Sequence, residues 1–193
     1  MANFGELMLV VGDFNIPEKA NFIPEKFKRM LVPNKMQHVI CTGNVGSKEQ
    51  YDELRQLAPN VHIVAGDTDK SNSLSFPETK VVQVGEFRIG IVHGHQILPF
   101  GDHTSLAAVR RKLDVDILVS GHTGKNEVVE HDGYYHINPG SITGAFSPFQ
   151  ENNIPSFILL AVQGENVVVY LYELIDGELE VSKTEFSKKS LSN

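Results

Sequence analysis

The sequence contains a single cysteine, no long hydrophobic run, and fewer basic than acidic side chains. Cys41 has no second cysteine to pair with, so an internal disulfide is excluded and nothing points to an oxidising compartment. The longest apolar runs, residues 7–11 and 157–162, are far shorter than the ~20 residues that cross a bilayer. Lys and Arg number 17 against 24 Asp and Glu, a formal net charge of −7, which argues against a nucleic-acid-binding protein.

The composition is that of an ordinary globular protein. Hydrophobic residues make up 41% of the 193 residues and charged residues 21%, and no repeat is present. We expect one domain over residues 1–186, followed by a polar tail over residues 187–193. Residues 1–6 lack a basic segment, so we expect no secretory signal and a cytoplasmic location.

The first half of the chain alternates strands with helices. Strands are expected at residues 7–11, 38–42 and 61–65, because each is a short apolar run that ends at a polar turn. Helices are expected after Pro24 and after Ser47, and Ser47 with Gln50 forms a capping-box pattern. Strands and helices in this order predict a parallel sheet with right-handed crossovers.

The second half contains mostly strands. One further helix is expected at residues 104–113. Strands are expected at residues 79–84, 88–92, 116–120, 127–130, 134–137, 156–162, 167–174 and 178–184. About ten short strands with three helices predict an α/β fold in which two sheets pack face to face with the helices outside.

Polar side chains recur where the predicted strands end. The segments are Asp13-Phe14-Asn15, Gly43-Asn44, Gly66-Asp67-Thr68-Asp69, His93-Gly94-His95 and Gly121-His122-Thr123-Gly124. Any one of them alone is typical of a turn. Because the carboxyl ends of strands in α/β sheets form ligand sites, five such segments together indicate a site for Zn, Mn or Fe.

The order of these segments resembles that of the calcineurin-like metallophosphoesterases. The resemblance implies a four-layer α-β-β-α sandwich in which two metals activate a water molecule. It also implies two sets of metal ligands. The first set is Asp13, Asn15, Asn44 and Gly124, and the second is Asn44, Asp67, His93 and His122.

Three departures from the family pattern argue against catalysis. Asn15 and Gly124 stand where the family has histidine, which cripples the first metal site. Thr68 stands where the family has the histidine that protonates the leaving group, and a hydroxyl cannot do this near neutral pH. We therefore expect a protein that is not an enzyme and requires no cofactor, with at most one weakly bound Zn or Mn. The alternative is a weak phosphoesterase that uses the second site alone, and a free-standing peptide-binding module is a third.

A longer resemblance covers nearly the whole chain and points to the phosphoesterase-like subunits of retromer. It rests on residues 41–44, 93–99, 114–123, 137–141 and 154–157. It implies a non-catalytic scaffold in endosomal cargo sorting and retrograde transport. The implied partners are the helical-repeat subunit of retromer and regulators of Rab GTPases or other effectors. Contact with the endosomal membrane is implied only through the complex.

Two apolar surfaces are expected to serve these partners. Ile97, Leu98 and Phe100 form an apolar loop beside the predicted metal site and are expected to contact the helical-repeat subunit. The alternative is that they fold inward as core. The resemblance places an effector patch at Leu7, Met30, Leu159, Tyr170, Tyr172 and Val181. The alternative is that both faces of these late strands are buried.

The remaining histidines are given structural roles. His38 and His62 begin strands, and His103 begins a helix. His131 and His136 flank a hairpin, where exposed side chains are expected.

Overall fold

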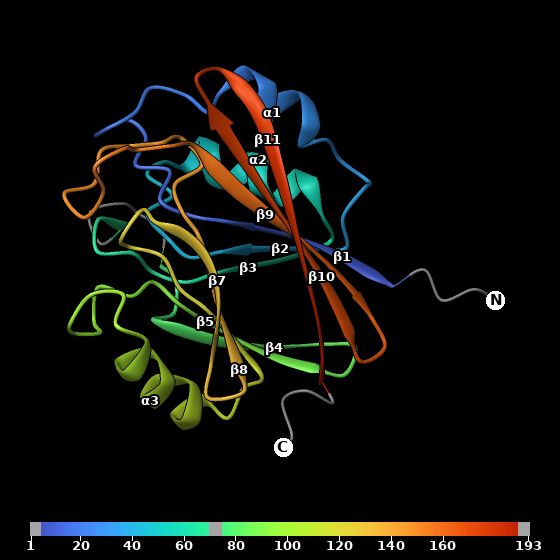
Figure 1. Cartoon of the computed structure of the whole chain (residues 1–193). Helices are drawn as coiled ribbons and strands as arrows, with labels where there is room; N and C mark the ends of the chain where they lie inside the picture. The colour runs from blue at the N-terminus through green and yellow to red at the C-terminus, as the bar shows by residue number, and fades with distance from the viewer. Residues whose placement is uncertain (1–4, 70–74, 189–193) are drawn as a thin grey trace.

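Two β-sheets lie face to face, with helices on both outer sides (Figure 1). The computed structural model describes residues 5–69 and 75–188. The elements in chain order are β1 (Glu6–Val11), α1 (Glu25–Met30), β2 (His38–Cys41), α2 (Lys48–Leu57), β3 (Asn60–Ile63), β4 (Thr79–Val84), β5 (Phe87–Val92), α3 (His103–Leu113), β6 (Ile117–Val119), β7 (Asn126–His131), β8 (Tyr134–Pro139), β9 (Ser156–Gln163), β10 (Asn166–Ile175) and β11 (Glu178–Ser187).

The larger sheet joins the two ends of the described chain. Its strand order is β11-β10-β9-β1-β2-β3. Strands β1, β2 and β3 run parallel, as the alternation of strands and helices predicts. On the other side β1 pairs antiparallel with β9, where Leu7 lies opposite Ala161, so an early strand and a late strand meet at the centre of the sheet.

The smaller sheet has the order β4-β5-β6-β8-β7. The predicted hairpins β4–β5 and β7–β8 form its two edges, and β6 lies parallel to both β5 and β8. Because β5 and β6 run in the same direction, the residues that follow them emerge at one end of this sheet.

Three hydrophobic layers hold the four structural layers together. Side chains of the two sheets pack against each other around fully buried residues such as Met8, Ile89 and Ile137. Phe14, Phe27 and their neighbours fill the space between the larger sheet and helices α1 and α2. A smaller cluster lies under α3, which covers the outer face of the smaller sheet (Figure 1). The predicted α/β sandwich is therefore confirmed.

Local signals explain how two of the helices begin. The Ser47 hydroxyl accepts a hydrogen bond from the Gln50 backbone N–H at 3.3 Å, which is half of the predicted capping box. Asp102 caps α3 in the same way by accepting from the Ser105 N–H at 2.8 Å. At the other end of the chain, Ser187 is the last residue of β11, and residues 189–193 of the expected tail lie outside the described residues.

Candidate functional site

The polar segments that follow the strands meet in one cavity, the strand-end pocket. It has a volume of about 310 Å³. Its walls are Asp13, Asn15, Lys19, Asn44, Asp67, Phe100, His122, Gly124, Ser141, Ala145, Phe146, Ser147, Pro148 and Phe149. His93 lies beside it, fully buried against Asp13 and Asp67. The structure therefore brings residues of these segments together at one place.

The backbone bends sharply at the pocket to aim these side chains inward. Asp13, Asn15, Asn44 and His122 adopt left-handed conformations, with φ of 48°, 49°, 52° and 71°. Such conformations are unfavourable for residues with a Cβ, and they concentrate at functional sites. Gly66 leaves room for this arrangement, because a Cβ there would lie 2.0 Å from Asn44 Oδ1.

Asp67, His93 and His122 form the part of the pocket best suited to a metal ion. One ligand atom from each lies within 4.8 Å of the others. His93 Nε2 lies 3.2 Å from Asp67 Oδ1, and His122 Nδ1 lies 3.9 Å from Asp67 Oδ2. His93 Nδ1 donates to the Thr42 carbonyl at 2.7 Å, so Nε2 is the nitrogen that faces Asp67: it carries a lone pair when the ring is neutral and an N–H directed at the carboxylate when the ring is charged. These donors suit one divalent cation of the zinc type.

Asn44, the fourth expected ligand, is hydrogen-bonded within the protein. Its amide Nδ2 donates to Asp67 Oδ1 at 2.9 Å. Its Oδ1 accepts from the Thr68 N–H at 3.1 Å and from the Thr68 hydroxyl at 2.8 Å. The oxygen that would bind a metal is thus already engaged by the residue that replaces the expected proton donor.

The first predicted metal site has one suitable ligand, Asp13. Its carboxylate is buried, and neither oxygen makes a short hydrogen bond, the nearest donors being the His93 ring and the His122 backbone N–H. Gly124 supplies no ligand, and with φ of 71° a Cβ there would lie 3.0 Å from the Ser147 Cβ. An imidazole at position 124 would therefore require the 147 loop to move. The two-metal centre of the family does not fit this donor set.

The charges of the pocket influence one another through short distances. Burial raises the pKa of Asp13 to about 6, against the opposing effect of the nearby His93. The pKa of Asp67 is lowered, chiefly by its hydrogen bond with His93. For His93 burial lowers the pKa, but the attraction of Asp13 and Asp67 outweighs it and the net shift is upward. Burial and the neighbouring His93 lower the pKa of His122.

The apolar loop beside the pocket is only partly exposed. Leu98 is 69% exposed and Phe100 39%. Ile97 is a correction to the sequence prediction, because it is 7% exposed and packs with Val92, Leu106 and Leu118 beneath α3. Ile97 therefore belongs to the core and is not available to a partner.

Two further aromatic residues at the pocket were not predicted. Phe146 is 65% exposed and Phe149 44%, and both line the pocket. The Phe149 ring contacts Phe100, and both rings contact His122, with centroid distances of 4.6–5.6 Å. We call Leu98, Phe100, Phe146 and Phe149 the rim. The sequence signal was Ala145-Phe146-Ser147-Pro148-Phe149, an aromatic pair in a turn-rich segment directly after residues 138–141.

The six residues of the expected effector patch share one outer face. The register of β9, β10 and β11 places Leu159 opposite Tyr170, and Tyr172 opposite Val181. Leu7 on β1 and Met30 on α1 pack against the core of the same face. Val181 is 49% exposed, and the other five are half-buried. We call these six residues the outer patch.

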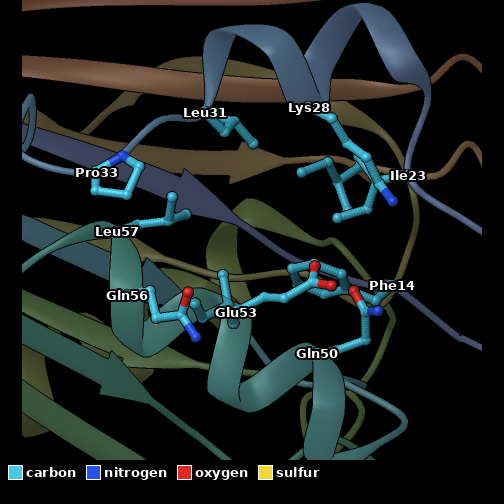
Figure 2. Close-up of a pocket in the computed structure, with 11 residues that line it drawn as sticks. Phe14, Ile23, Lys28, Leu31, Pro33, Gln50, Glu53, Gln56 and Leu57 are labelled. Carbon is cyan, nitrogen blue, oxygen red and sulfur yellow. The ribbon is translucent and has the colours of Figure 1, made fainter.

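A second cavity lies between α1 and α2 (Figure 2). It has a volume of about 270 Å³, and Phe14, Ile23, Leu31 and Leu57 form much of its wall. Lys28, Gln50, Glu53 and Gln56 stand around its opening. None of the predicted metal ligands lines this cavity.

The helices in the described part of the chain are all too short or too polar to cross a membrane.

Comparisons with known proteins match most of the chain. Residues 7–165 match the model of the calcineurin-like phosphoesterase superfamily domain. Vacuolar protein sorting-associated protein 29 of Schizosaccharomyces pombe is 37% identical over 186 residues, which cover 94% of this chain and 98% of the relative.

Solved structures agree with the sequence match. Vacuolar protein sorting 29 from Cryptosporidium parvum has a TM-score of 0.91 at 46% identity, covering 96% of this chain and 100% of that one. Wild-type Vps29 from Entamoeba histolytica, solved in complex with Zn²⁺, has a TM-score of 0.88 at 46% identity, covering 94% and 99% of the two chains.

Proposed function

Because the chain belongs to the Vps29 family of the calcineurin-like phosphoesterase superfamily, we propose that it is a non-catalytic scaffold subunit of retromer. In this role it acts in endosomal cargo sorting and retrograde transport. It docks the helical-repeat subunit of retromer over the strand-end pocket. The observation that carries this proposal is the rim, where three exposed phenylalanines line the pocket and the exposed Leu98 lies two residues before Phe100.

The donor set of the pocket supports a role without catalysis. Hydrolysis of a phosphoester by this fold needs two metals to activate water and a group that protonates the leaving oxygen. Gly124 offers no ligand, and Thr68 is hydrogen-bonded to Asn44 with a hydroxyl that does not release its proton near neutral pH. The pocket therefore lacks both requirements.

Replacing Leu98 with aspartate tests the docking face. The new carboxylate would be desolvated in the interface, so Leu98→Asp is expected to cost about 2–4 kcal/mol, a loss of affinity of roughly 30-fold or more. Binding to the purified helical-repeat subunit is measured by calorimetry. Leu179→Asp, at a 37% exposed leucine on β11, is the matched control and should bind normally. Unchanged affinity of a folded Leu98→Asp variant would exclude this face.

We further propose that the pocket holds one divalent metal weakly, with Asp67, His93 and His122 as ligands. The zinc complex of the Entamoeba relative supports metal binding, and the spacing of the three ligand atoms, all within 4.8 Å of one another, supports this site. Calorimetry and elemental analysis are expected to give one equivalent of Zn²⁺, and His93→Ala should abolish it. His62→Ala, at a half-buried histidine of β3, is the control and should keep the metal. Two bound equivalents would contradict the proposal, as would binding that survives His93→Ala.

The same three ligands favour a second candidate, a weak single-metal phosphoesterase. An assay with a generic aryl phosphate under excess Mn²⁺ or Zn²⁺ decides between the two. We expect no turnover above that of the His93→Ala and Asp67→Ala variants. Turnover that both substitutions abolish would establish the enzyme instead.

We propose that the outer patch recruits regulators of Rab GTPases or other effectors. Its Tyr and Met side chains combine large contact area with adaptability, which suits an interface with several partners. As a subunit of retromer, the protein takes its location from the complex. The protein is cytoplasmic and reaches endosomes as a peripheral component of retromer, and residues 1–186 act as one domain.

A further inference from the structure

A cluster of polar side chains lies between α3 and the outer face of the smaller sheet. The register of β7 and β8 puts alternate residues on this face, and α3 contributes two more from above. The members are His103 and Arg110 on α3, Glu127 and His131 on β7, and Tyr134 and His136 on β8. The prediction that His136 is exposed is wrong, because its exposed fraction is 2%.

The rings of His103 and His136 meet head to head. Their Nδ1 atoms lie 3.0 Å apart, their centres 5.3 Å apart, and their planes differ by 16°. The distance between the two ring centres exceeds the distance between the two Nδ1 atoms by about the diameter of an imidazole ring. Both Nδ1 atoms therefore lie nearly on the straight line that joins the two ring centres. The two lone-pair directions therefore point at each other, and one proton must lie between them.

Glu127 determines which ring supplies that proton. Its Oε1 lies 3.3 Å from His103 Nε2, and its Oε2 accepts the Lys125 ammonium at 3.0 Å. A carboxylate accepts only, so the neutral His103 ring carries its hydrogen on Nε2 and presents a bare Nδ1 to His136. His136 then donates from Nδ1, which leaves its buried Nε2 as an acceptor without a partner, as observed.

Positive charge surrounds this pair on several elements. Arg110 is 9% exposed, lies 3.5 Å over the Tyr134 ring, and donates to the Val115 carbonyl at 3.2 Å. The His131 ring centre lies 5.6 Å from His136 and 6.1 Å from His103, and its Nδ1 is 3.4 Å from Asp132 in the β7–β8 turn. Burial and then the charges of His103, His131 and Arg110 lower the pKa of His136 to about 4.

The pair is attached to the rim through the first turn of α3. His103 is the first residue of this helix, directly after the cap residue Asp102. Two residues later the Ser105 hydroxyl donates to the Leu98 carbonyl at 3.0 Å. The His103 ring and the Leu98 backbone are therefore held by the same helical turn.

We propose that Glu127, His103 and His136 form a proton-sensitive clamp that holds the start of α3 on the smaller sheet, and that acidification opens it and thereby loosens the Leu98 side of the rim. With one added proton the pair can still keep a hydrogen bond between the two Nδ1 atoms. With a second proton both Nδ1 atoms are hydrogen-bond donors, and they face each other at 3.0 Å with the Arg110 charge nearby. Neither N–H then has an acceptor as long as the clamp stays closed.

The experiment follows the full-length protein by NMR of the imidazole nitrogens and by hydrogen exchange of α3 amides. At pH 7.5 we expect the Nε2–H form of His103 and the Nδ1–H form of His136. Because His136 shifts from an ordinary pKa of 6.5 to about 4 in the closed state, the opening equilibrium of α3 should rise about 10- to 30-fold between pH 7.5 and pH 5, after correction for intrinsic exchange.

Two variants give this experiment its controls. His136→Phe removes the titration and should reduce the pH response of α3 below about 2-fold. His62→Phe replaces the half-buried histidine of β3, whose pKa is likewise lowered to about 4, and should leave the response of α3 intact. If His136→Phe does not fold, the tautomers of His103 and His136 measured by NMR in the wild-type protein test the proposal instead. The opposite tautomers at pH 7.5 would overturn the proposal, as would an unchanged pH response in His136→Phe.

The link to docking rests on the proposed function and has its own readout. Affinity for the helical-repeat subunit should fall with α3 opening between pH 7.5 and pH 5 in the wild type and stay level in His136→Phe. Absence of binding at every pH would refute the docking role while the exchange data still decide the clamp. Binding that falls equally in both proteins would show that the clamp does not control the rim.

Discussion

Asp13 and Asp69 are two aspartates of equal burial with opposite surroundings. Both are 3% exposed. The carboxylate of Asp69 accepts the backbone N–H groups of Asn44, Val45 and Gly66 at 2.7–2.9 Å. That of Asp13 makes no short hydrogen bond, and its charge is favoured only by the His93 ring, 3.6 Å from Oδ1, and by the His122 backbone N–H. A buried charge without donors destabilises the folded state, whereas one with three donors holds loops in place.

We predict that Asp13→Asn stabilises the metal-free protein. Burial raises the folded pKa from 3.8 to about 6, so the ionised group costs stability that grows as pH rises through this interval and is constant above it. The gain should be about 1–3 kcal/mol at pH 7, because the substitution also removes the favourable attraction between Asp13 and His93 and so loses part of the benefit. It should disappear near pH 4, where Asp13 is protonated in the folded protein. Urea unfolding at several pH values measures this.

Asp69→Ala is the matched comparison for this prediction. It leaves buried N–H groups without an acceptor and should destabilise by about 2–4 kcal/mol. Equal destabilisation by Asp13→Asn and Asp69→Ala would show that Asp13 is satisfied in the folded protein.

At the scale of elements, the close packing of helix α3 on the smaller sheet requires a glycine, Gly90, beneath it. Gly90 lies in the middle of β5, where a Cβ would come within 2.9 Å of Val115 and 3.2 Å of Leu113, at the end of α3. These are side-chain atoms of a packed layer, so the helix would have to move outward to make space.

We therefore predict that Gly90→Ala destabilises the protein by about 1–3 kcal/mol, through overpacking under α3. Gly164→Ala serves as the control, because nothing lies within 4 Å of a Cβ there and only its φ of 59° is unfavourable, at a cost of about 1 kcal/mol. Denaturant midpoints measure both. A Gly90→Ala variant as stable as the Gly164→Ala variant would contradict the packing argument.

The elements were predictable from the sequence because their signals are local. Capping at Ser47, turns at Gly-rich pairs and apolar runs located every helix and strand of the described residues to within a few positions. Side-chain contacts between different elements could not be predicted from the sequence. His136 looked exposed and Ile97 looked like a contact residue because their burial depends on where α3 lies, and Phe146 and Phe149 reached the pocket through a loop with no periodic pattern.

At the scale of the whole molecule, the two proposed interfaces belong to different structural units. The rim lies in the loops after β5 and β8, and its three phenylalanines line the strand-end pocket. The outer patch lies on α1 and on strands of the larger sheet, with Tyr172 and Val181 paired on β10 and β11. The two surfaces share no residue.

We predict that the helical-repeat subunit and an effector bind at the same time and independently. Val181→Asp should weaken effector binding by roughly 30-fold and leave the helical-repeat subunit bound, while Leu98→Asp should do the reverse. When one partner is already bound at saturation, the affinity for the other partner, measured by calorimetry, should change by less than about twofold. Mutual exclusion of the two partners would contradict this separation.

The position of β1 has a consequence for synthesis of the chain. Its partner β9 is encoded about 150 residues later, since Leu7 lies opposite Ala161. At about 5–20 residues per second, a ribosome needs roughly 10–30 s to supply that partner. During this interval the nascent protein carries a bare apolar strand edge, which attracts other unfinished chains. The larger sheet therefore cannot be completed before translation has passed residue 163, the end of β9.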